Sequence, residues 1–403
     1  MENEIKICFV ADKHNLYDDR IYWKMAVPLK KRGFDIYYLL IDNETEKGIT
    51  KEGIKYEILK LKTFSKNRYL NFILKNLNPF NNYKKILKKA KLINADIYHF
   101  HDLWINKIGK KLKRLEQKPV VIYDAREPYA EDYISYIKAK GVLRYFIKVF
   151  STMVDKWEKK VSKNYDLVIS NEEIVRDRFR KEIGQDKAEV LYNYTDIYKE
   201  YKNIPFNAKE YDFIYCGGIT KERGAFKILE ATLLAKEKMP TIKVAFVGTY
   251  SPNNLKNELS AFILNNNLKE NIILHSAVDY NKISEFYNKS KVGLVTLFPN
   301  KTFEISMPIK IFEYMAFGLP IIGSNFGHIK EYIEEDNCGI IVNSLDSIEI
   351  SNAMIELLTD RKKYDLYSNN GRKATLKKYR WDFEFDRLIG YYTKLLNERE
   401  SNK

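Results

Sequence analysis

The sequence has few cysteines, no long apolar run and no leader-like beginning. Its three cysteines, Cys8, Cys216 and Cys338, are scattered and lack the spacing of metal ligands, so we interpret them as small core residues of a protein in a reducing compartment. No run of about 18 apolar residues is present, which argues against a membrane-spanning helix. The opening residues "MENEIKICFVADK" lack the regions of a signal peptide. We therefore expect a cytoplasmic protein.

Common cofactor and metal motifs are missing too. The glycine-rich stretch "YCGGITKERG" has neither the G-x-G-x-x-G spacing of dinucleotide-binding folds nor a Walker motif, which argues against a nicotinamide cofactor and an ATPase. Only five histidines occur, and no Asp-x-Asp pair stands beside the two of them in "DIYHFHDLW" to hold a metal on a diphosphate. We expect neither a cofactor nor a metal.

Acidic residues are fewer than basic residues, and most of the difference lies in the first half of the chain. The net charge is +15; residues 1–200 carry 41 basic and 29 acidic residues, whereas residues 201–403 carry 28 and 25. Residues 51–120 hold 18 basic and 5 acidic residues, notably in "YKKILKKAKL" and "KIGKKLKRLEQK". This pattern is compatible with a solvated lysine face or with an anionic partner.

Short apolar segments alternate with segments of helical length along the whole chain. A chain of 403 residues exceeds the roughly 250 to 300 at which single cores stop growing, so two domains are expected. The first series of strands contains "IKICFVAD", "FDIYYLLID", "ADIYHFHD", "PVVIYDA", "YDLVISN" and "AEVLYN". The second contains "YDFIYCGG", "IKVAFVGTY", "NIILHSAV", "KVGLVTLF", "LPIIGSN" and "CGIIVN". This alternation predicts two doubly wound α/β domains, joined by a linker at 195–211, with ligands bound beyond the carboxyl ends of the strands.

One of these strand ends predicts an anion site. "YCGGITKERGAFKILEA" runs from a strand into Gly217 and Gly218, then through Arg223 into a helix. Glycines let the backbone approach a phosphate, and a helix N-terminus with a neighbouring arginine supplies N–H donors and a forked cation. A diphosphate would fit here; the alternative is a glycine turn with a surface arginine.

A second strand end leads into "SMPIKIFEYMAFGLPII", which is almost wholly apolar apart from Lys310 and Glu313. We expect a loop at "PNKTFEI" and then a helix buried nearly all round, with free N–H groups near Ser306 as another anion site. Glu313 lies one turn beyond Lys310 on the same side, where it could accept hydrogen bonds from a ribose diol. An internal ion pair between Lys310 and Glu313 is the alternative.

Two strand ends in the first half carry titratable groups. "DIYHFHDLW" places His99 and His101 on the same side of a strand, and "VIYDAREPY" places Asp124 and Glu127 at the end of the next. Two of five histidines at one strand end indicate a reaction centre, although a single histidine in a strand is more often structural.

The order of these motifs resembles the retaining glycosyltransferases of family 4. The motifs are "DDRIYWKMAVPLKKRGFDI", "HFHDLW", "VIYDAREPY", "VLYNYTD", "YCGGITKERG", "SMPIKIFEYMAFGLPII" and "YRWDFEFDRLIGYYTKLL", and "KIFEYMAFGLP" is the most specific. The resemblance implies the GT-B fold, two Rossmann-like domains facing across a cleft. It implies an acceptor-side domain at 1–200, a nucleotide-sugar-binding domain at 208–379, and a C-terminal helix at 380–403 that crosses back to the first domain.

The resemblance also implies roles for individual residues. Glu313 would hold the ribose, Val278 would lie near the base, and His101 would approach the donor sugar as the catalytic residue. The diphosphate would be surrounded by residues of both strand ends: Gly217, Gly218, Arg223, Ser306 and Lys310. The acceptor would be faced by Asp19, Arg20 and Glu127.

The chain departs from the commoner family pattern at one position. Many members have a second glutamate eight residues before the ribose-binding one, where this chain has Ile305, and Glu304 is out of register. Two other interpretations therefore stay open: a non-catalytic GT-B partner subunit, and a sugar-nucleotide epimerase of the same fold.

The resemblance implies a hexosyl or related transfer in polysaccharide or glycoconjugate biosynthesis, by same-face substitution without a metal. The leaving diphosphate would help to deprotonate the acceptor hydroxyl. Because the excess positive charge lies in the first half, we expect that half to dock peripherally on an anionic membrane and reach a lipid-linked or cell-surface glycan acceptor. Nucleic acid is not expected as a partner.

Overall fold

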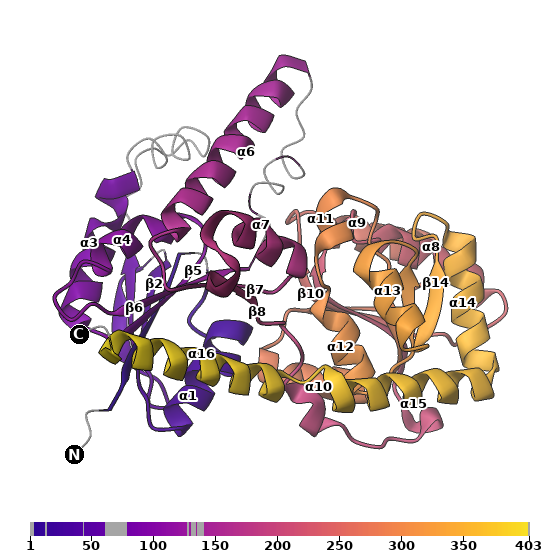
Figure 1. The fold of residues 1–403 in the computed structure, drawn as a ribbon. Coiled ribbons are helices and arrows are strands. Elements are labelled where there is room, and N and C mark those ends of the chain that lie inside the picture. Colours follow the sequence, from indigo (N-terminus) through magenta and orange to yellow (C-terminus); the bar gives the residue numbers. More distant parts are fainter. Residues whose placement is uncertain are drawn as a thin grey trace. The chain divides into compact units, whose positions relative to one another are not determined.

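The computed structural model describes residues 4–12, 14–42, 44–60, 79–126, 129, 134 and 141–401. The chain forms two units, Met1–Asn193 with Asp382–Lys403, and Tyr194–Trp381. Each unit is a mainly parallel sheet with helices on both faces, as the alternating pattern predicts (Figure 1). The prediction of two doubly wound α/β domains is thereby confirmed.

The first unit is built on a sheet of eight strands in the order β3-β4-β2-β1-β5-β6-β7-β8. Its strands are β1 (Lys6–Ala11), β2 (Asp35–Asp42), β3 (Glu46–Ile49), β4 (Lys55–Lys60), β5 (Ile97–His101), β6 (Val120–Ala125), β7 (Leu167–Ser170) and β8 (Ala188–Val190). Its helical elements are η1 (Asp19–Ala26), α1 (Val27–Lys31), α3 (Pro79–Ile93), η2 (Trp104–Ile108), α4 (Gly109–Leu112), α6 (Gly141–Ser162), α7 (Glu173–Ile183), η3 (Gln185–Lys187) and α16 (Trp381–Ser401). All pairings are parallel except that of β3 with β4.

Successive side chains of β5 point to opposite faces of this sheet. Tyr98 and Phe100 belong to the apolar core that β5 shares with α3, η2 and α7. His99 and His101 point to the opposite face, where the hydroxyl of Tyr392 in α16 lies 2.7 Å from His99 Nδ1. Figure 1 shows α3, α4 and α6 on one side of the sheet and α1 and α16 on the other. The two histidines therefore lie on the face covered by η1 and α16.

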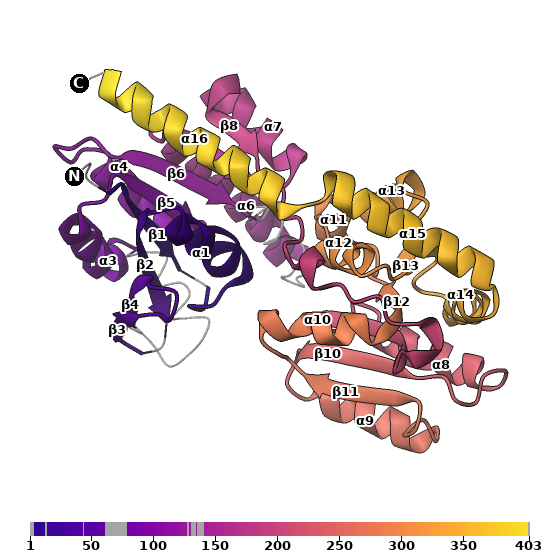
Figure 2. The same cartoon turned by 90° about the horizontal axis from the view of Figure 1, so that it is seen from below.

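The second unit has a sheet of six parallel strands in the order β11-β10-β9-β12-β13-β14. The strands are β9 (Tyr211–Ile219), β10 (Val244–Tyr250), β11 (Ile272–Ser276), β12 (Ser290–Val295), β13 (Ile321–Ser324) and β14 (Gly339–Val342). The helical elements are η4 (Ile197–Glu200), η5 (Phe206–Ala208), α8 (Ala225–Lys236), α9 (Leu255–Asn265), η6 (Tyr280–Lys282), α10 (Ile283–Asn288), α11 (Lys301–Ile305), α12 (Ile309–Ala316), α13 (Gly327–Glu335), α14 (Ser347–Thr359) and α15 (Arg361–Lys378). In Figure 2 strands β10 and β11 lie between α9 and α10.

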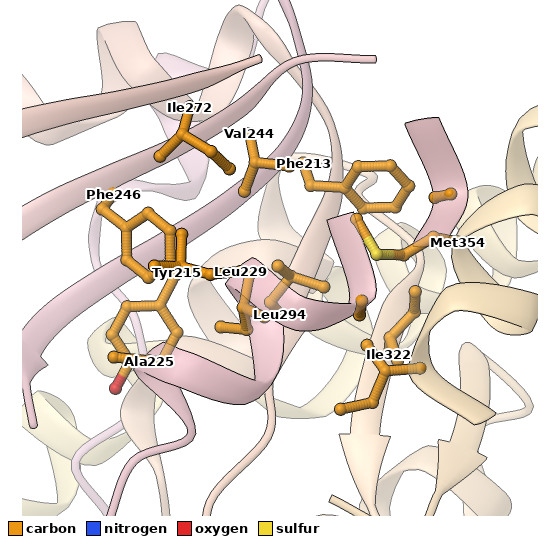
Figure 3. Packing of buried hydrophobic residues seen from close by; sticks show 14 of the residues in the cluster. Phe213, Tyr215, Ala225, Leu229, Val244, Phe246, Ile272, Leu294, Ile322 and Met354 are labelled. Atoms are coloured by element: carbon orange, nitrogen blue, oxygen red, sulfur yellow. The ribbon is translucent and has the colours of Figure 1, made fainter. Parts of the chain in front are cut away.

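One face of this second sheet forms a continuous apolar core. Phe213 and Tyr215 from β9 pack with Phe246 from β10 and Leu229 from α8, all at most 1% exposed (Figure 3). Burying such side chains contributes about 1.5 to 3 kcal/mol each, so this core fixes β9 and α8 relative to one another.

Each sheet has a point where the strand order reverses. In the first unit it lies between β1 and β5, and in the second between β9 and β12. Parallel strands end at the same edge of the sheet. At each reversal point, the loops after the two adjacent strands, β1 and β5 in the first unit and β9 and β12 in the second, lead to opposite faces of the sheet. Ligands of doubly wound sheets bind at this point.

Three local expectations from the sequence differ from the structure. The stretch 195–211 is not a free linker: it contains η4 and η5, and Thr195 O accepts a hydrogen bond from Trp381 N at 2.9 Å. "PNKTFEI" is not only a loop, because Asn300 caps the short helix α11 through its side chain. Strands β3 and β4 were not indicated by their polar sequences. Among the described residues, no helix has both the length and the apolar composition needed to cross a membrane.

Candidate functional sites

The glycines after β9 form a bend at the reversal point of the second sheet. Gly217 adopts a φ of +112°, and Gly248 beside it leaves no room for a side chain, since a Cβ there would lie 1.7 Å from Gly217 O. Gly224, with a φ of +81°, begins α8 at a point where a Cβ would lie 2.2 Å from Thr296 O. The glycines are therefore required by close backbone packing, and Gly217 itself is exposed.

Lys310 brings a buried cation to this bend. It lies in the first turn of α12 and is 9% exposed, with Nζ 3.9 Å from the centroid of the Tyr215 ring. Nζ is 3.6 Å from the position of a Cβ on Gly217, and it has no hydrogen-bond partner in the part of the chain that the structure describes. A buried ammonium without a partner is costly, so this position favours binding of an anion.

Glu313 makes no hydrogen bond to Lys310, whose Nζ has no hydrogen-bond partner among the described residues, so the alternative of a hydrogen-bonded ion pair is not found here. Its Oε2 accepts a hydrogen bond from the Tyr287 hydroxyl at 2.7 Å, and the residue is half-buried rather than enclosed. The helix is fixed to β9 by Tyr314, whose hydroxyl accepts from Cys216 N at 2.9 Å. Gly293 makes room for the Tyr314 ring, 2.2 Å from where a Cβ would lie. Glu313 is thus an oriented acceptor on the same helix as Lys310.

The other predicted donor residues surround the same strand ends. Arg223 lies beside Gly218, with its Cζ 3.9 Å from the position of a Cβ there and 5.3 Å from the centroid of the Phe303 ring. Ser306 is half-buried between α11 and α12. Val278 is half-buried in the loop after β11, at the same edge of the sheet. Gly217, Gly218, Arg223 and Lys310 are brought together, whereas Val278 follows a strand that is two places away from β9.

Thr296 was not predicted from the sequence, and the segment before Ser306 is helical where a loop was predicted. Thr296 follows β12 and is fully buried, and its Oγ1 has no hydrogen-bond partner among the described residues. The only sequence signal was its position after a strand at the reversal point. Ile305 and Glu304 lie in the last turn of α11, where Glu304 is exposed.

In the first unit, His99, His101 and Asp124 form a fully buried group. The two imidazole rings stack with centroids 4.6 Å apart, and His101 Nδ1 lies 3.5 Å from Asp124 Oδ2. Neither ring nitrogen of His101 has a hydrogen-bond partner within the described residues. Burial lowers the pKa of His99 to about 4 and lowers that of His101 well below its usual range. His101 is therefore neutral near pH 7, and contact with a substrate would require residues around it to move.

Arg20 was predicted to face the acceptor, and the structure places its side chain in the interior of the first unit. The side chain is fully buried, with Nε 2.9 Å from Asp124 Oδ2 and Nη2 donating to Leu191 O at 3.0 Å. Arg20 instead positions Asp124 beneath His101.

Arg20 also affects whether the group of His99, His101 and Asp124 could bind a metal. His99, His101 and Asp124 offer ligand atoms within 4.8 Å of one another, as a metal site would require. The Arg20 guanidinium already balances the Asp124 charge, and a divalent ion would lie next to that fixed cation. The group suits a neutral imidazole better than a divalent metal.

A polar cluster that the sequence analysis missed lies at the reversal point of the first sheet. His14, which follows β1, places Nδ1 2.8 Å from Asp18 Oδ2 and Nε2 3.2 Å from Asp102 Oδ1. Arg126, after β6, approaches His14 and Asp18 with Nη1 at 3.2 and 3.3 Å. Burial alone would lower the pKa of His14, but the hydrogen bonds with Asp102 and Asp18 outweigh it and raise the pKa to about 9. Strand order, which the sequence did not provide, would have identified this cluster.

The two remaining residues predicted to face the acceptor are Asp19 and Glu127. Asp19 begins η1 and keeps 30% of its side chain exposed, with Oδ1 3.9 Å from Arg126 Nη2. Its neighbour Asp18 caps the helix by accepting from Arg20 N and Ile21 N. Glu127 lies outside the described residues.

A protein-family model matches within the second unit. Residues 196–374 match the family model of the glycosyl transferases group 1. The chain is 24% identical over 186 residues to the capsular polysaccharide biosynthesis glycosyltransferase CapM of Staphylococcus aureus, covering 46% of this chain and 47% of CapM. It is 24% identical over 185 residues to spore coat protein SA of Bacillus subtilis, covering 45% and 48%. Each match spans about half of the relative.

Solved structures match over almost the whole chain. Sucrose-phosphate synthase of Thermosynechococcus elongatus superposes with a TM-score of 0.72 at 14% identity, covering 98% of this chain and all of that one. HepE of Anabaena, solved in complex with UDP-glucose, gives 0.69 at 15% identity, covering 97% and 100%. The chain thus has the two-domain GT-B fold of these proteins.

Proposed function

We propose that this protein is a retaining glycosyltransferase that moves a hexosyl or related sugar from a nucleotide-diphosphate sugar to a lipid-linked or cell-surface glycan. The observation that carries the proposal is the buried ammonium of Lys310, which lies beside Gly217 at the reversal point of the second sheet and has no hydrogen-bond partner in the described part of the chain. The match of residues 196–374 to the glycosyl transferases group 1 supports transfer chemistry, and the UDP-glucose complex of HepE supports a nucleotide-sugar donor.

In this proposal, the diphosphate of the donor lies against the bend at Gly217 and Gly218. Lys310 and Arg223 stabilise the negative charge that grows on the leaving diphosphate, which is worth most in a site from which water is excluded. Glu313, oriented by the hydroxyl of Tyr287, accepts hydrogen bonds from the ribose diol. The sequence has no glutamate at Ile305 to hold the sugar, so the identity of the sugar depends on other contacts.

For the reaction step we propose same-face substitution at the anomeric carbon. The bond to the diphosphate oxygen breaks as the acceptor oxygen bonds to the same face, and the acceptor proton passes to the leaving diphosphate. His101, neutral because it is buried, serves as a hydrogen-bonding group for the donor sugar once the residues that cover it move. Two positive side chains balance the diphosphate, so the transfer proceeds without a resident metal.

A donor screen followed by product analysis tests the proposal. Thermal unfolding is measured with uridine, guanosine and adenosine diphosphate sugars, and a stabilising donor is then incubated with lipid-linked or glycan acceptors. We expect the donor and product to have the same anomeric configuration by nuclear magnetic resonance. Inverted configuration would contradict the retaining mechanism. Loss of turnover with EDTA that magnesium or manganese restores would contradict metal-free transfer.

The same experiment separates the two other interpretations. An epimerase converts the donor without an acceptor, whereas the transferase releases sugar slowly without one. A non-catalytic partner subunit gives no stabilisation by any donor and no heat of binding in calorimetry. Either result would replace the proposed function.

A further inference from the structure

Helix α6 has a packed half and an exposed half. Its carboxyl-terminal half packs on the first unit through Val154, which is 4% exposed and clusters with Leu103, Tyr129 and Trp157. The amino-terminal half extends away from the rest of the unit (Figure 1). The packed half therefore fixes the direction of the exposed half.

The exposed half carries large apolar side chains that face away from the unit. They are Val142 (74% exposed), Leu143 (60%), Tyr145 (66%), Phe146 (62%), Val149 (40%) and Met153 (64%). Except for Leu143, their spacing of three and four residues places them on one side of the helix. No other helix within the described residues exposes more than two large apolar side chains. We call these six residues the α6 stripe.

Such an unpartnered stripe marks a binding surface. Single exposed apolar side chains are common on soluble proteins, but a contiguous group on one helix is not, because it loses the free energy gained by removing apolar area from water. The group is not needed for folding, since Val154 and its neighbours already fix α6 on the opposite side.

Within the described residues 141–154, the charges of α6 are of one sign. Arg144 and Lys148 are exposed in the same half of α6, and no acidic residue occurs in 141–154. Helix α3 in the same unit exposes four more lysines, and α3 and α6 both pack against η2. An apolar stripe with aromatic members and flanking basic residues is typical of helices that lie in the interface of an anionic bilayer.

We propose that the α6 stripe docks this protein on an anionic lipid surface, with the apolar side chains at the boundary between headgroups and acyl chains. Tyr145 and Phe146 enter this boundary, while Arg144 and Lys148 contact lipid phosphates. A second copy of the chain fits less well, because a symmetric contact would bring two sets of cationic side chains together without an acidic partner. The proposal does not depend on transfer activity.

Sedimentation of the full chain with vesicles tests this docking. Vesicles of phosphatidylcholine alone are compared with vesicles that also contain phosphatidylglycerol. We expect binding to the anionic vesicles only. The double variant Tyr145→Ser, Phe146→Ser should lower the apparent affinity by about tenfold or more, because it removes the two largest apolar groups from the boundary.

A matched control variant separates insertion of the α6 stripe from nonspecific adsorption of exposed apolar side chains. Leu264→Ser with Ile348→Ser removes two side chains that are 54% and 61% exposed in the second unit, and should leave binding unchanged. Thermal unfolding of the stripe variant should equal that of the parent, since both replaced side chains are exposed.

Three outcomes would overturn the proposal. The first is recovery of the parent in the supernatant with both kinds of vesicle at low salt. The second is equal binding by the stripe variant and the parent. The third is sedimentation of the parent as a dimer that the stripe variant dissociates, which would assign the stripe to a second copy.

Discussion

Glu313 is the residue for which the structure decides most clearly between two interpretations. The Tyr287 hydroxyl donates a hydrogen bond to its carboxylate and orients it, while Lys310 Nζ makes no hydrogen bond to any described residue. We expect Glu313→Gln to weaken donor binding by roughly 1 kcal/mol, about fivefold, since a charge-assisted hydrogen bond is replaced by a neutral one. Calorimetry with the donor found by the screen measures this. Glu304→Gln, at an exposed position, is the control; equal affinity of parent and Glu313→Gln would remove the ribose role.

Replacing Lys310 should have opposite effects on the stability of the second unit and on sugar transfer. Removing a buried ammonium that has no hydrogen-bond partner among the described residues should stabilise the unit, whereas a bound diphosphate would lose a neighbouring cation. We expect Lys310→Met to raise the free energy of unfolding by about 1 kcal/mol in urea titrations and to lower transfer by roughly 10- to 1000-fold.

The control for this prediction is a lysine that has a partner. Lys291 Nζ lies 2.7 Å from Asp212 Oδ1, so Lys291→Met should lower stability and leave donor binding unchanged. A loss of stability in Lys310→Met comparable to that in Lys291→Met would show that Lys310 supports the fold and not an anion.

His14 and His99 should make the stability of the first unit depend on pH in opposite directions. A histidine in the unfolded chain has a pKa of about 6.5. The native pKa of His14 is raised to about 9, so its contribution to stability is complete below pH 6.5 and is lost as pH rises through 9. For His99 the native pKa is lowered to about 4, so its neutral form contributes above pH 6.5, and that contribution is lost as pH falls toward 4.

We therefore expect His14→Gln to change the alkaline side of the stability profile. The variant should be less stable than the parent at pH 6, and the difference should shrink as pH rises to 9, because the parent loses the His14 proton over that range. Urea unfolding at a series of pH values measures the difference. A constant difference from pH 6 to 9 would mean that His14 is not protonated in the native state.

At the scale of elements, the turn from β9 into α8 depends on one backbone conformation. Gly224→Ala places a Cβ 2.2 Å from Thr296 O at a φ of +81°, and should lower the free energy of unfolding by about 2 to 4 kcal/mol and abolish donor binding. Gly390→Ala in α16 meets nothing within 4 Å and should raise stability by about 0.5 to 1 kcal/mol. Thermal and urea unfolding measure both; a mild effect of Gly224→Ala would show that the turn relaxes.

Sequence patterns predicted the elements that apolar residues define. The twelve segments rich in β-branched and aromatic residues all form strands, because a parallel sheet buries both faces. Strands β3 and β4 were missed because "EKGI" and "KYEILK" lie toward the edge of the sheet, where polar residues stay exposed. Helix α11 was missed because its stability depends on the Asn300 cap rather than on a long apolar pattern.

The site was predictable only in part, since sequence gives strand ends but not strand order. Gly217 and Lys310 were identified because glycines and a lone lysine stand out in apolar surroundings. His14 and Asp102 meet only because β1 and β5 are neighbours in the sheet, which no local pattern encodes. The acceptor-side role of Arg20 came from the family resemblance, and its burial beside Asp124, which compensates its charge in the interior, was not visible in the sequence.

At the scale of the molecule, the excess of positive charge in the first 200 residues predicts a salt-dependent attraction to anionic surfaces. Helix α3 contributes four exposed lysines, and each charge near an anionic leaflet is worth about 1 kcal/mol. The lysines are Lys84, Lys85, Lys88 and Lys91. Replacing all four by glutamine should weaken vesicle binding at low salt by about tenfold or more and flatten its dependence on ionic strength, because salt screens the charges that were removed.

The stripe variant of α6 should behave differently in the same titration. It loses apolar contacts and keeps its lysines, so its binding should be weaker at every salt concentration while the slope against ionic strength stays that of the parent. Lys269→Gln with Lys362→Gln, two exposed lysines of the second unit, is the charge control and should match the parent. If the α3 variant retains the parent's salt dependence, the lysine-rich face of α3 is only solvated, and the attraction must come from another part of the chain.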